Sequence, residues 1–473
     1  MKKIRYIIYM FVALLATTSC EGFLNITPDG QSKRDDQLST EQGIEDAMYG
    51  VYSQLRSSSL YGQELYFKTL EVLAHNLYSK DNDDIKALAN FEYSNTEVKS
   101  LFEGIWTAMY KNISNVNSVL AAPLVANATT FPYTIYRGEA LGLRAFMHFD
   151  LVRLFTEQYT QNPNAKGIPY ATEFSLNTPD FESLKENYKH ILADLHEADS
   201  LLADEDKYEG ERNYMLDRQI HFNRYAVWGT LARVYLTMGN KEMATKYAQK
   251  AIENNGKYYL KEKTKVKDDL AGVLSEKECL FGIYYSKWFS TVNTILVQTN
   301  PKTSLYLRND FRDMYEKDAS GSDNRFSAYF SEGTYGDDLI HRLSKFIDVY
   351  EKNNTVANRP SHLILGINMI RIPEMHYILA ETLLDSDYDT ALSHYDAVRV
   401  NRGLEPLEDK TLTQELINDE RFREMIGEGQ TFFNMKRLNL EISAASASDK
   451  IYKPGDQNLY VVPIPDIEIE NRN

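Results

Sequence analysis

Aromatic side chains with polar neighbours are the residues of this sequence best suited to binding a ligand. They are frequent in two stretches, 60–100 and 256–365, which are also rich in Tyr, Asn, Asp, Ser and Gly. An aromatic ring offers a flat apolar face, and tyrosine adds a hydroxyl at its edge. Sugars present C–H faces and hydroxyl rims that match such rings. The contacts that we expect are Tyr78, Asp81, Tyr93, Trp288 and Tyr306. The alternative is that most of these rings only pack the two stretches onto the rest of the fold.

Motifs for catalysis are missing from the sequence. It contains no phosphate loop, no dinucleotide-binding glycine pattern, no Gly-x-Ser-x-Gly elbow and no His-Glu-x-x-His. Its nine histidines are scattered. A glycoside hydrolase needs two carboxylates about 5–10 Å apart, and no pair stands out among 68 acidic residues. We therefore expect a protein that binds without catalysis and uses no cofactor.

An acidic loop, Asp81-Asn82-Asp83-Asp84, offers the hard oxygen ligands that Ca²⁺ prefers. The loop lacks the alternating spacing and the glycine of an EF-hand loop. We therefore expect these residues to form a solvated turn that caps a following helix, and we expect no metal. A calcium site is the alternative.

The first twenty residues have the pattern of a lipoprotein signal. Three basic residues precede an apolar run, Tyr6 to Ala16, which is shorter than the roughly 20 residues needed to span a bilayer. Small residues then lead into Cys20. We expect a signal peptide at 1–19, lipid attachment at Cys20 and a lipidated tether over 20–38. An ordinary secretory signal with an incidental cysteine is the alternative.

The charge of the chain argues against nucleic acid as a partner. There are 52 Lys and Arg against 68 Asp and Glu, a net charge of −16, whereas binding to nucleic-acid phosphates depends on clustered Lys and Arg. A neutral or cationic ligand is therefore more compatible with the charge of this chain than an anionic one. The second cysteine, Cys279, lies in an apolar run, and we expect it to be a buried, inert thiol.

Amphipathic stripes predict a mostly α-helical body. Apolar residues recur with helical spacing over 44–55, 102–116, 143–154 and 181–195. Two later segments, 231–252 and 372–398, each have the pattern of two helices joined by a short turn. The first also matches the tetratricopeptide pattern, in which small alanines let the two helices approach closely. We expect residues 39–473 to form one helical-repeat domain with large insertions at about 60–100 and 256–365.

The two insertions lack a sustained helical period. Their aromatic content argues against disorder, and long irregular segments inside a compact domain usually carry function. The apolar stretches Leu280–Tyr285 and Leu363–Leu365 are candidates for short strands.

Motifs in a fixed order run along nearly the whole chain. The early ones are Trp106-x3-Tyr110-x2-Ile113-x3-Asn117, Gly138-Glu139-Ala140-Leu141-x2-Arg144-Ala145-Phe146 and Gly167-Ile168-Pro169. The later ones are Arg371-Ile372-Pro373-Glu374, Arg402-Gly403-Leu404, Arg421-x-Arg423-Glu424, Gly427-Glu428-Gly429 and Pro463-Ile464-Pro465. Each motif alone is moderately specific, but their joint order resembles the SusD/RagB-like nutrient-binding lipoproteins of the outer membrane.

Three positions depart from the pattern of this family. Phe422 and Gln430 stand where an Arg is usual, and Asn434 stands where an Asp is common. They lie in a block that we interpret as structural, and they suggest that neutral contacts replace a local set of ion pairs.

The resemblance implies a mostly α-helical fold in which tetratricopeptide-like helix pairs support an irregular, insertion-rich ligand-binding half with few short strands. It implies a lipid-anchored, surface-exposed protein of the outer membrane that binds an oligosaccharide. Such a protein delivers its nutrient to a SusC-like TonB-dependent transporter, without catalysis. The resemblance also places the ligand surface largely in the two insertions. A peptide-binding member of the family is the first alternative, followed by a surface glycan hydrolase and a protein-interaction scaffold.

Overall fold

The computed structural model describes residues 34, 36–175, 177, 179–254, 256–261, 274, 277–297, 300, 303–316, 323–347, 350, 355–360, 363–408, 411–443, 457–470 and 472. Most of this is helix, and the strands are short and paired two by two, which confirms the predicted fold class. Cys20, the predicted signal peptide and most of the predicted tether lie outside the described residues. Within the described part, no helix has the length and apolar character needed to cross a membrane.

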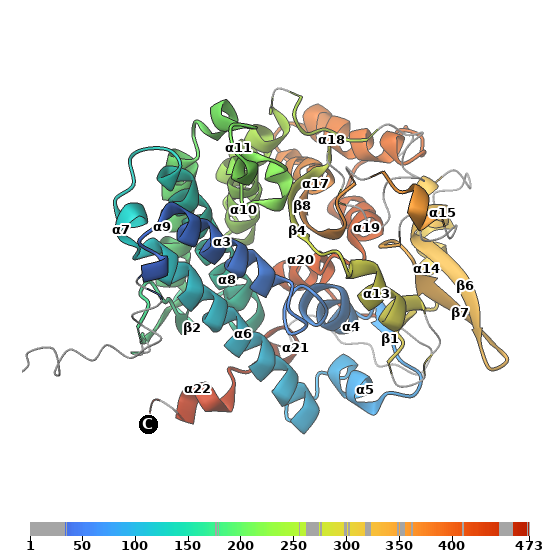
Figure 1. The fold of residues 1–473 in the computed structure, drawn as a ribbon. Coiled ribbons are helices and arrows are strands. Elements are labelled where there is room, and N and C mark those ends of the chain that lie inside the picture. The colour runs from blue at the N-terminus through green and yellow to red at the C-terminus, as the bar shows by residue number, and fades with distance from the viewer. Residues whose placement is uncertain are drawn as a thin grey trace, which may run out of the picture.

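Four long helices correspond to the four predicted amphipathic segments. They are α3 (Glu41–Leu55), α6 (Thr96–Leu120), α8 (Tyr133–Phe155) and α9 (Leu184–Leu201). The helix α8 packs against both α6 and α9 (Figure 1), and every residue from Gly138 to Phe155 is buried. Its charged residues are therefore paired: the guanidinium of Arg144 donates two hydrogen bonds of 2.7 Å to the carboxylate of Asp194 on α9.

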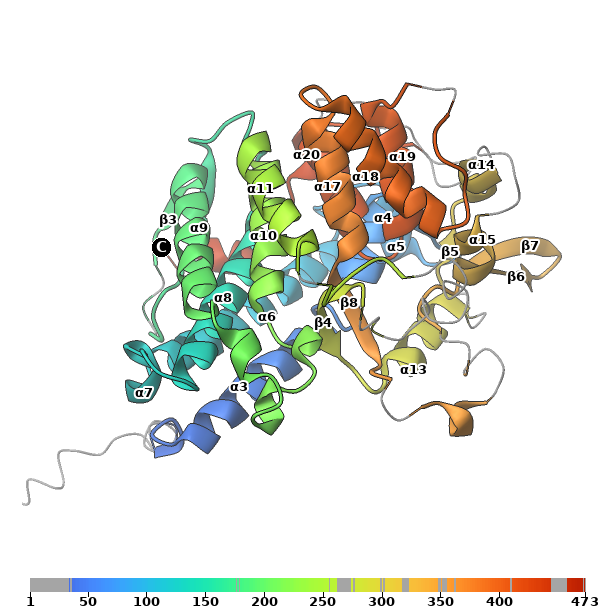
Figure 2. The same ribbon diagram turned by 90° about the horizontal axis from the view of Figure 1, so that it is seen from above.

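The two predicted helix pairs are present. The first is α10 (Arg224–Thr237) with α11 (Lys241–Ile252), and the second is α17 (Ile372–Leu383) with α18 (Tyr388–Asn401). Gly239 makes the first turn with a φ of +76°, and the side chain of Asn240 caps α11. Although the pairs are far apart in the sequence, α17 packs directly on α11 (Figure 2). The tetratricopeptide-like scaffold is thus built by stacking non-contiguous pairs.

The second insertion contains four of the eight described strands. The strand predicted at Leu280–Tyr285 is present as β4 (Cys279–Tyr284), whereas the one expected at Leu363–Leu365 lies further along the chain, as β8 (Gly366–Arg371). These two strands pair antiparallel, and their backbone hydrogen bonds fix which residues of the apolar run are extended. Cys279 is a buried free thiol, as predicted.

The remaining elements of this insertion lie on the right of Figure 1. They are α13 (Trp288–Val292), β5 (Tyr306–Leu307), α14 (Phe311–Glu316), α15 (Asn324–Tyr329), β6 (Phe330–Tyr335) and β7 (Asp338–Leu343). The first insertion is more helical than predicted. It holds a π-helix (Leu65–Leu70), α4 (Glu71–Leu73), β1 (Leu77–Tyr78) and α5 (Asp83–Ala89). Such short helices contain too few turns for a stripe to show in the sequence.

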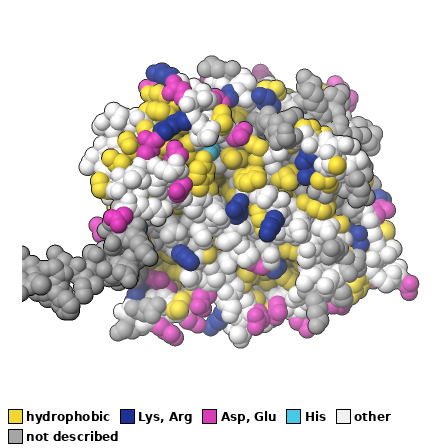
Figure 3. Space-filling model, in the orientation of Figure 1, with side chains coloured by type: hydrophobic (Ala, Val, Ile, Leu, Met, Phe, Trp, Pro, Cys, Tyr) yellow, Lys and Arg dark blue, Asp and Glu magenta, His cyan; other side chains and the backbone are white. Residues whose placement is uncertain are grey.

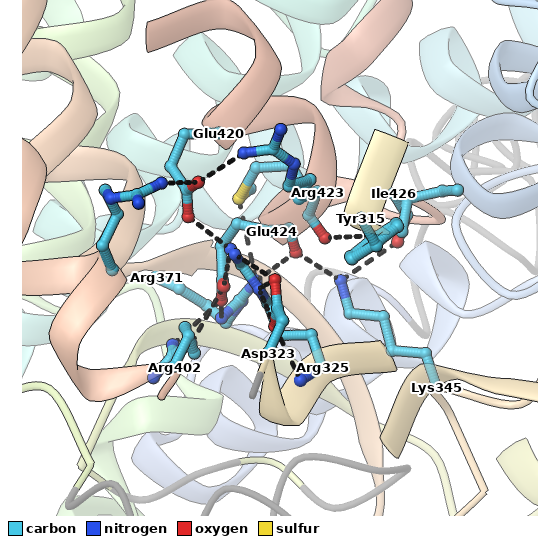
Figure 4. A network of polar contacts seen from close by, with 12 residues as sticks. Tyr315, Asp323, Arg325, Lys345, Arg371, Arg402, Glu420, Arg423, Glu424 and Ile426 are labelled. Atoms are coloured by element: carbon cyan, nitrogen blue, oxygen red, sulfur yellow. Dashed lines mark hydrogen bonds and ion pairs between the residues drawn. The ribbon is translucent and has the colours of Figure 1, made fainter. Parts of the chain in front are cut away.

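A buried network of ion pairs joins the strand-bearing half to the helix pairs (Figure 4). At its centre is Glu424 on α19 (Gln414–Met425), whose carboxylate accepts hydrogen bonds from Arg402 at 2.9 Å and Arg371 at 2.8 Å. Arg325, just before β6, is paired with the same carboxylate at 3.4 Å. Lys345, just after β7, donates to the backbone carbonyl of Glu424 at 2.7 Å. Both ends of the β6–β7 hairpin are therefore held by buried charges.

Of the three positions that depart from the family pattern, Phe422 is buried, and the other two contact arginines. Gln430 accepts a hydrogen bond of 3.2 Å from Arg153, and Asn434 accepts bonds of 2.7 Å from both Arg421 and Arg437. Neutral contacts are thus present at Gln430 and Asn434, but the surrounding block keeps many ion pairs.

Glu71 connects the first insertion to the same region. It is fully buried, and its carboxylate accepts hydrogen bonds from the backbone N–H of Gly429 at 2.9 Å and from Asn76 at 2.7 Å. Gly429 has a φ of +71°, and a Cβ there would meet the Tyr66 side chain at 2.7 Å, so the contact requires glycine. Burial raises the pKa of Glu71 to about 7.

Glu71→Gln is expected to remove a pH-dependent part of the stability. Because the folded-state pKa is raised, the contribution of this carboxyl is present below its unfolded value of 4.5 and is lost as the pH rises to about 7. The free energy of unfolding of the wild type should therefore fall relative to the variant by about 3 kcal/mol across this window. Urea unfolding of both proteins from about pH 5 to 8 measures the difference. A difference that does not change with pH contradicts the prediction.

Candidate ligand-binding site

Three tyrosines from distant parts of the sequence form a row on the strand-bearing half. The strands β1 and β5 pair antiparallel with Tyr78 opposite Tyr306, and their ring centroids are 6.0 Å apart. Tyr335, at the end of β6, also lies beside Tyr306, with 5.9 Å between ring centroids. The strand β5, which pairs with β1, also packs against β7 of the β6–β7 hairpin. We call Tyr78, Tyr306 and Tyr335 the tyrosine row.

Charged side chains surround one end of the row. The hydroxyl of Tyr335 donates a hydrogen bond to the carboxylate of Asp81. This bond raises the pKa of Tyr335 to about 12, with smaller contributions from burial and the charge of Asp81. The ammonium of Lys80 lies 5.4 Å from the Tyr335 ring centre and 2.6 Å from a carboxylate oxygen of Asp338. At neutral pH this end of the row therefore presents a phenol, an ammonium and two carboxylates.

The members of the row differ in exposure. Tyr306 is 1% exposed and contacts the other two rings from within the core, whereas Tyr78 and Tyr335 are each partly exposed. The hydroxyl of Tyr78 donates to the side-chain oxygen of Asn309 at 3.3 Å, and Asn309 and Asp81 are exposed. An aromatic surface with amide and carboxylate groups at its edge matches a ligand that has both C–H faces and hydroxyls.

Trp288 does not join the row. Its indole is 1% exposed and packs against Phe67 and Phe346, with ring centroids 4.9 and 5.6 Å away. Such a buried ring presents no face to a ligand, so in this structure Trp288 is a core residue. The physical reason is that a large aromatic side chain contributes strongly to stability when it is removed from water.

Tyr93 also lies apart from the row. Its ring packs against Phe91 and Phe102, and its hydroxyl donates a hydrogen bond of 2.6 Å to the backbone carbonyl of Leu459. These contacts assign Tyr93 to packing, where it attaches the segment around Leu459 to the first insertion. Of the five predicted contacts, Tyr78, Asp81 and Tyr306 are therefore brought together and the other two are not.

Sequence reasoning missed Tyr335 and its neighbours Lys80, Asn309 and Asp338. A signal for the hairpin was available: the sequence contains Gly336-Asp337, and a two-residue loop that starts with Gly is typical of a β-hairpin. The structure has this hairpin, with Tyr335 opposite Asp338 and a φ of +60° at Gly336.

The acidic loop beside the row is a helix cap. The side chain of Asn82 accepts hydrogen bonds from the backbone N–H groups of Asp84 and Ile85, and so caps α5. Asp83 pairs with Lys86 at 3.0 Å. The predicted capping role is confirmed. Across the described ranges, no three His, Cys, Asp or Glu side chains are grouped so as to hold a metal ion.

Comparison with known proteins assigns this helical binding scaffold to a family. Residues 22–236 match a family model described as starch-binding and associating with the outer membrane. Residues 232–472, about half of the chain, match the model of the SusD family. The chain belongs to the SusD family.

Individual relatives are distant in sequence. A SusD-like protein of Formosa agariphila is 25% identical over 265 residues, which are 54% of this chain and 48% of that protein. A SusD superfamily protein of Bacteroides thetaiotaomicron is 20% identical, with a TM-score of 0.72 over 91% of this chain and 97% of its own. A SusD-like carbohydrate-binding protein of Bacteroides vulgatus is also 20% identical, with a TM-score of 0.70 over 91% and 96%. The chain spans about half the length of the first relative, and the structural likenesses show a shared fold.

Proposed function

We propose that this chain is a non-catalytic surface protein that binds an oligosaccharide nutrient on the tyrosine row. The observation that carries the proposal is the row itself, in which Tyr78 and Tyr335 are partly exposed and each lies beside Tyr306. The C–H face of a sugar ring stacks on such rings, while its hydroxyls reach the polar groups of Asn309 and Asp81 at the edge. The description of the first matched family model as starch-binding supports this ligand class.

A neutral glycan suits the charges at the row better than an acidic one. The cation beside Tyr335, Lys80, is already paired with Asp338, while Asp81 adds a second, exposed carboxylate. An acidic sugar placed there would be repelled by these carboxylates. On the face drawn in Figure 3, basic side chains are scattered among acidic and uncharged ones, which favours neither a polyanionic glycan nor nucleic acid.

The proposal includes a location and a partner. We propose that residues 1–19 are removed, that Cys20 carries the lipid anchor and that residues 20–38 tether the helical body to the outer face of the outer membrane. The bound glycan then passes to a SusC-like TonB-dependent transporter. The description of the first family model as associating with the outer membrane supports this location. Anchoring raises the effective concentration of a weak binder beside its transporter.

A basic peptide is the second candidate ligand. The exposed carboxylates of Asp81 and Asp338 would pair with Lys or Arg side chains, and the net charge of −16 favours a cationic guest. The proposed site is the same, but peptide binding would depend on electrostatic attraction, and salt would weaken it strongly.

Calorimetric titration of residues 21–473 with a panel of neutral oligosaccharides and basic peptides tests the proposal. We expect saturable binding of at least one oligosaccharide, with a Kd between about 1 µM and 1 mM, little changed by salt. If only the peptides bind, the ligand is a peptide and not an oligosaccharide. Release of new reducing ends from the oligosaccharide would contradict a non-catalytic role.

A further inference from the structure

A small cavity on the helical half is lined by four arginines. It lies where α8, α10, α17, α19 and α20 (Gln430–Leu438) meet, and the helices α10, α17, α19 and α20 can be followed in Figure 2. The arginines are Arg153, Arg233, Arg421 and Arg437. The free volume is about 40 Å³, and a narrower cavity of about 20 Å³ adjoins it. This space admits a small ion or an acid group and is too small for a sugar ring.

The charges around the cavity do not balance. Its ion pairs are Arg153–Asp150, Arg233–Glu374, Arg421–Glu381 and Arg437–Glu381. Among the residues that the structure describes, four guanidinium groups thus share three carboxylates, because Glu381 pairs with two of them. The other shared acceptor of Arg421 and Arg437 is the neutral side chain of Asn434, at 2.7 Å from each. One positive charge is left over, in a chain whose net charge is −16.

Two further ionisable residues lie close to the four arginines. Lys436 and Glu157 line the adjoining cavity and have opposite charges. Burial and the charge of Arg153 lower the pKa of Lys436 to about 7. Burial also lowers the pKa of Arg421, and the charge of Arg437 adds to this against the opposing charge of Glu381. Burial is the main cause of both shifts, and a neighbouring guanidinium group adds to each.

Several arginine N–H groups at the cavity are buried and unsatisfied. Within the described part of the chain, no hydrogen-bond partner is found for Nη1 of Arg233, for Nε and Nη2 of Arg421 or for Nε of Arg153. The three residues are only 3%, 5% and 8% exposed. Buried donors are rarely left without a partner in native proteins, and a bound ion can satisfy donors that the protein itself does not. Guanidinium groups are also the side chains best matched to oxyanions.

We propose that this cavity binds a small oxyanion, namely a carboxylate, sulfate or phosphate group. The surplus positive charge attracts the anion, and the unsatisfied N–H groups of Arg233 and Arg421 hold it. The anion is either free in solution or the acid group of a sugar acid whose ring stays outside the cavity. The site is separate from the tyrosine row, so the proposal does not depend on the ligand bound there.

Asn434→Asp tests the proposal without removing an arginine. The new carboxylate takes the place of the amide between Arg421 and Arg437, and it supplies the missing negative charge. Residues 21–473 are titrated calorimetrically with sodium sulfate, sodium phosphate and sodium acetate at constant ionic strength. We expect saturable binding of at least one anion, at one site per chain, and an affinity at least tenfold lower in the variant. The variant should also have a higher Tm than the wild type in the absence of the anion.

Asn115→Asp is the matched control, because it makes the same change at a partly exposed position on α6 that lines none of these cavities. It should bind the anion as the wild type does. The absence of saturable binding in the wild type overturns the proposal, and so does equal affinity in Asn434→Asp. Titration with glucuronate distinguishes a free anion from the acid group of a sugar acid as the natural ligand. Tighter binding than acetate supports a sugar acid, and equal or weaker binding supports a free anion.

Discussion

Glu424→Gln is expected to lower the free energy of unfolding by about 3–5 kcal/mol. The carboxylate is fully buried and is hydrogen-bonded or paired with three arginines, Arg325, Arg371 and Arg402. Removing its charge leaves these cations buried without their shared partner, and breaking a buried ion pair costs far more than breaking an exposed one. Because the network anchors both ends of the β6–β7 hairpin, the variant should also bind its ligand more weakly.

Urea unfolding of the wild type and the variant measures this effect. The matched control is Glu197→Gln, the same chemical change in an ion pair between α9 and Arg137 on α8 in which Glu197 is 47% exposed. Exposed pairs contribute less than about 1 kcal/mol, so the control should unfold almost like the wild type. Equal losses in the free energy of unfolding of the two variants would show that the buried ion pairs stabilise the fold no more than an exposed pair does.

The deficit of Glu424→Gln should shrink in acid. Burial alone would raise the pKa of Glu424, but the charges of Arg402 and Arg371 hold it well below its usual value of 4.5. Because this folded-state pKa is lowered, the stability that the carboxylate contributes is present above pH 4.5 and is lost as the pH falls towards the folded-state value. The gap between wild type and variant should therefore be widest near neutral pH.

Tyr335→Ala is expected to weaken oligosaccharide binding about tenfold, equivalent to about 1.4 kcal/mol. The substitution removes a partly exposed ring at one end of the tyrosine row and leaves Tyr78 and Tyr306 in place. Tyr335→Phe keeps the ring and removes only the hydroxyl that donates to Asp81. If stacking dominates, the phenylalanine variant should lose roughly threefold or less. Calorimetric titration with the best oligosaccharide of the panel measures both.

The control for the row is Tyr259→Ala. Tyr259 is 46% exposed and contacts Lys277 rather than any member of the row. Its removal should leave the affinity unchanged. If Tyr335→Phe is as damaging as Tyr335→Ala, the hydroxyl and not the ring carries the interaction. If neither substitution changes the affinity, the ligand binds elsewhere on the molecule.

The helix pairs were predictable because their signal is local. Helical spacing is repeated within each segment, and the Gly239-Asn240 turn lies between the two helices that it joins. The stacking of α17 on α11 is a contact between distant segments, and no pattern within either segment specifies it. The buried charge network is similar: Glu424, Arg371 and Arg325 come from three separate motifs or stretches, and only the fold brings them together.

The tyrosine row was predictable only in part for the same reason. Composition identified the two insertions, and Tyr78, Asp81 and Tyr306 from them do meet. The register that puts Tyr78 opposite Tyr306 depends on two strands of two residues each, which is too short for a pattern in the sequence. Trp288 was predicted to contact the ligand because of its large ring. The same large ring stabilises the fold when it is buried, and the structure places it in the core.

A crystal structure of residues 21–473 with the best-binding oligosaccharide would show directly where the ligand binds. We expect sugar density over Tyr78 and Tyr335, with a ring face against at least one of the two and hydroxyls within hydrogen-bond distance of Asn309 or Asp81. Density bound at any other surface, with the tyrosine row left empty, would contradict this expectation.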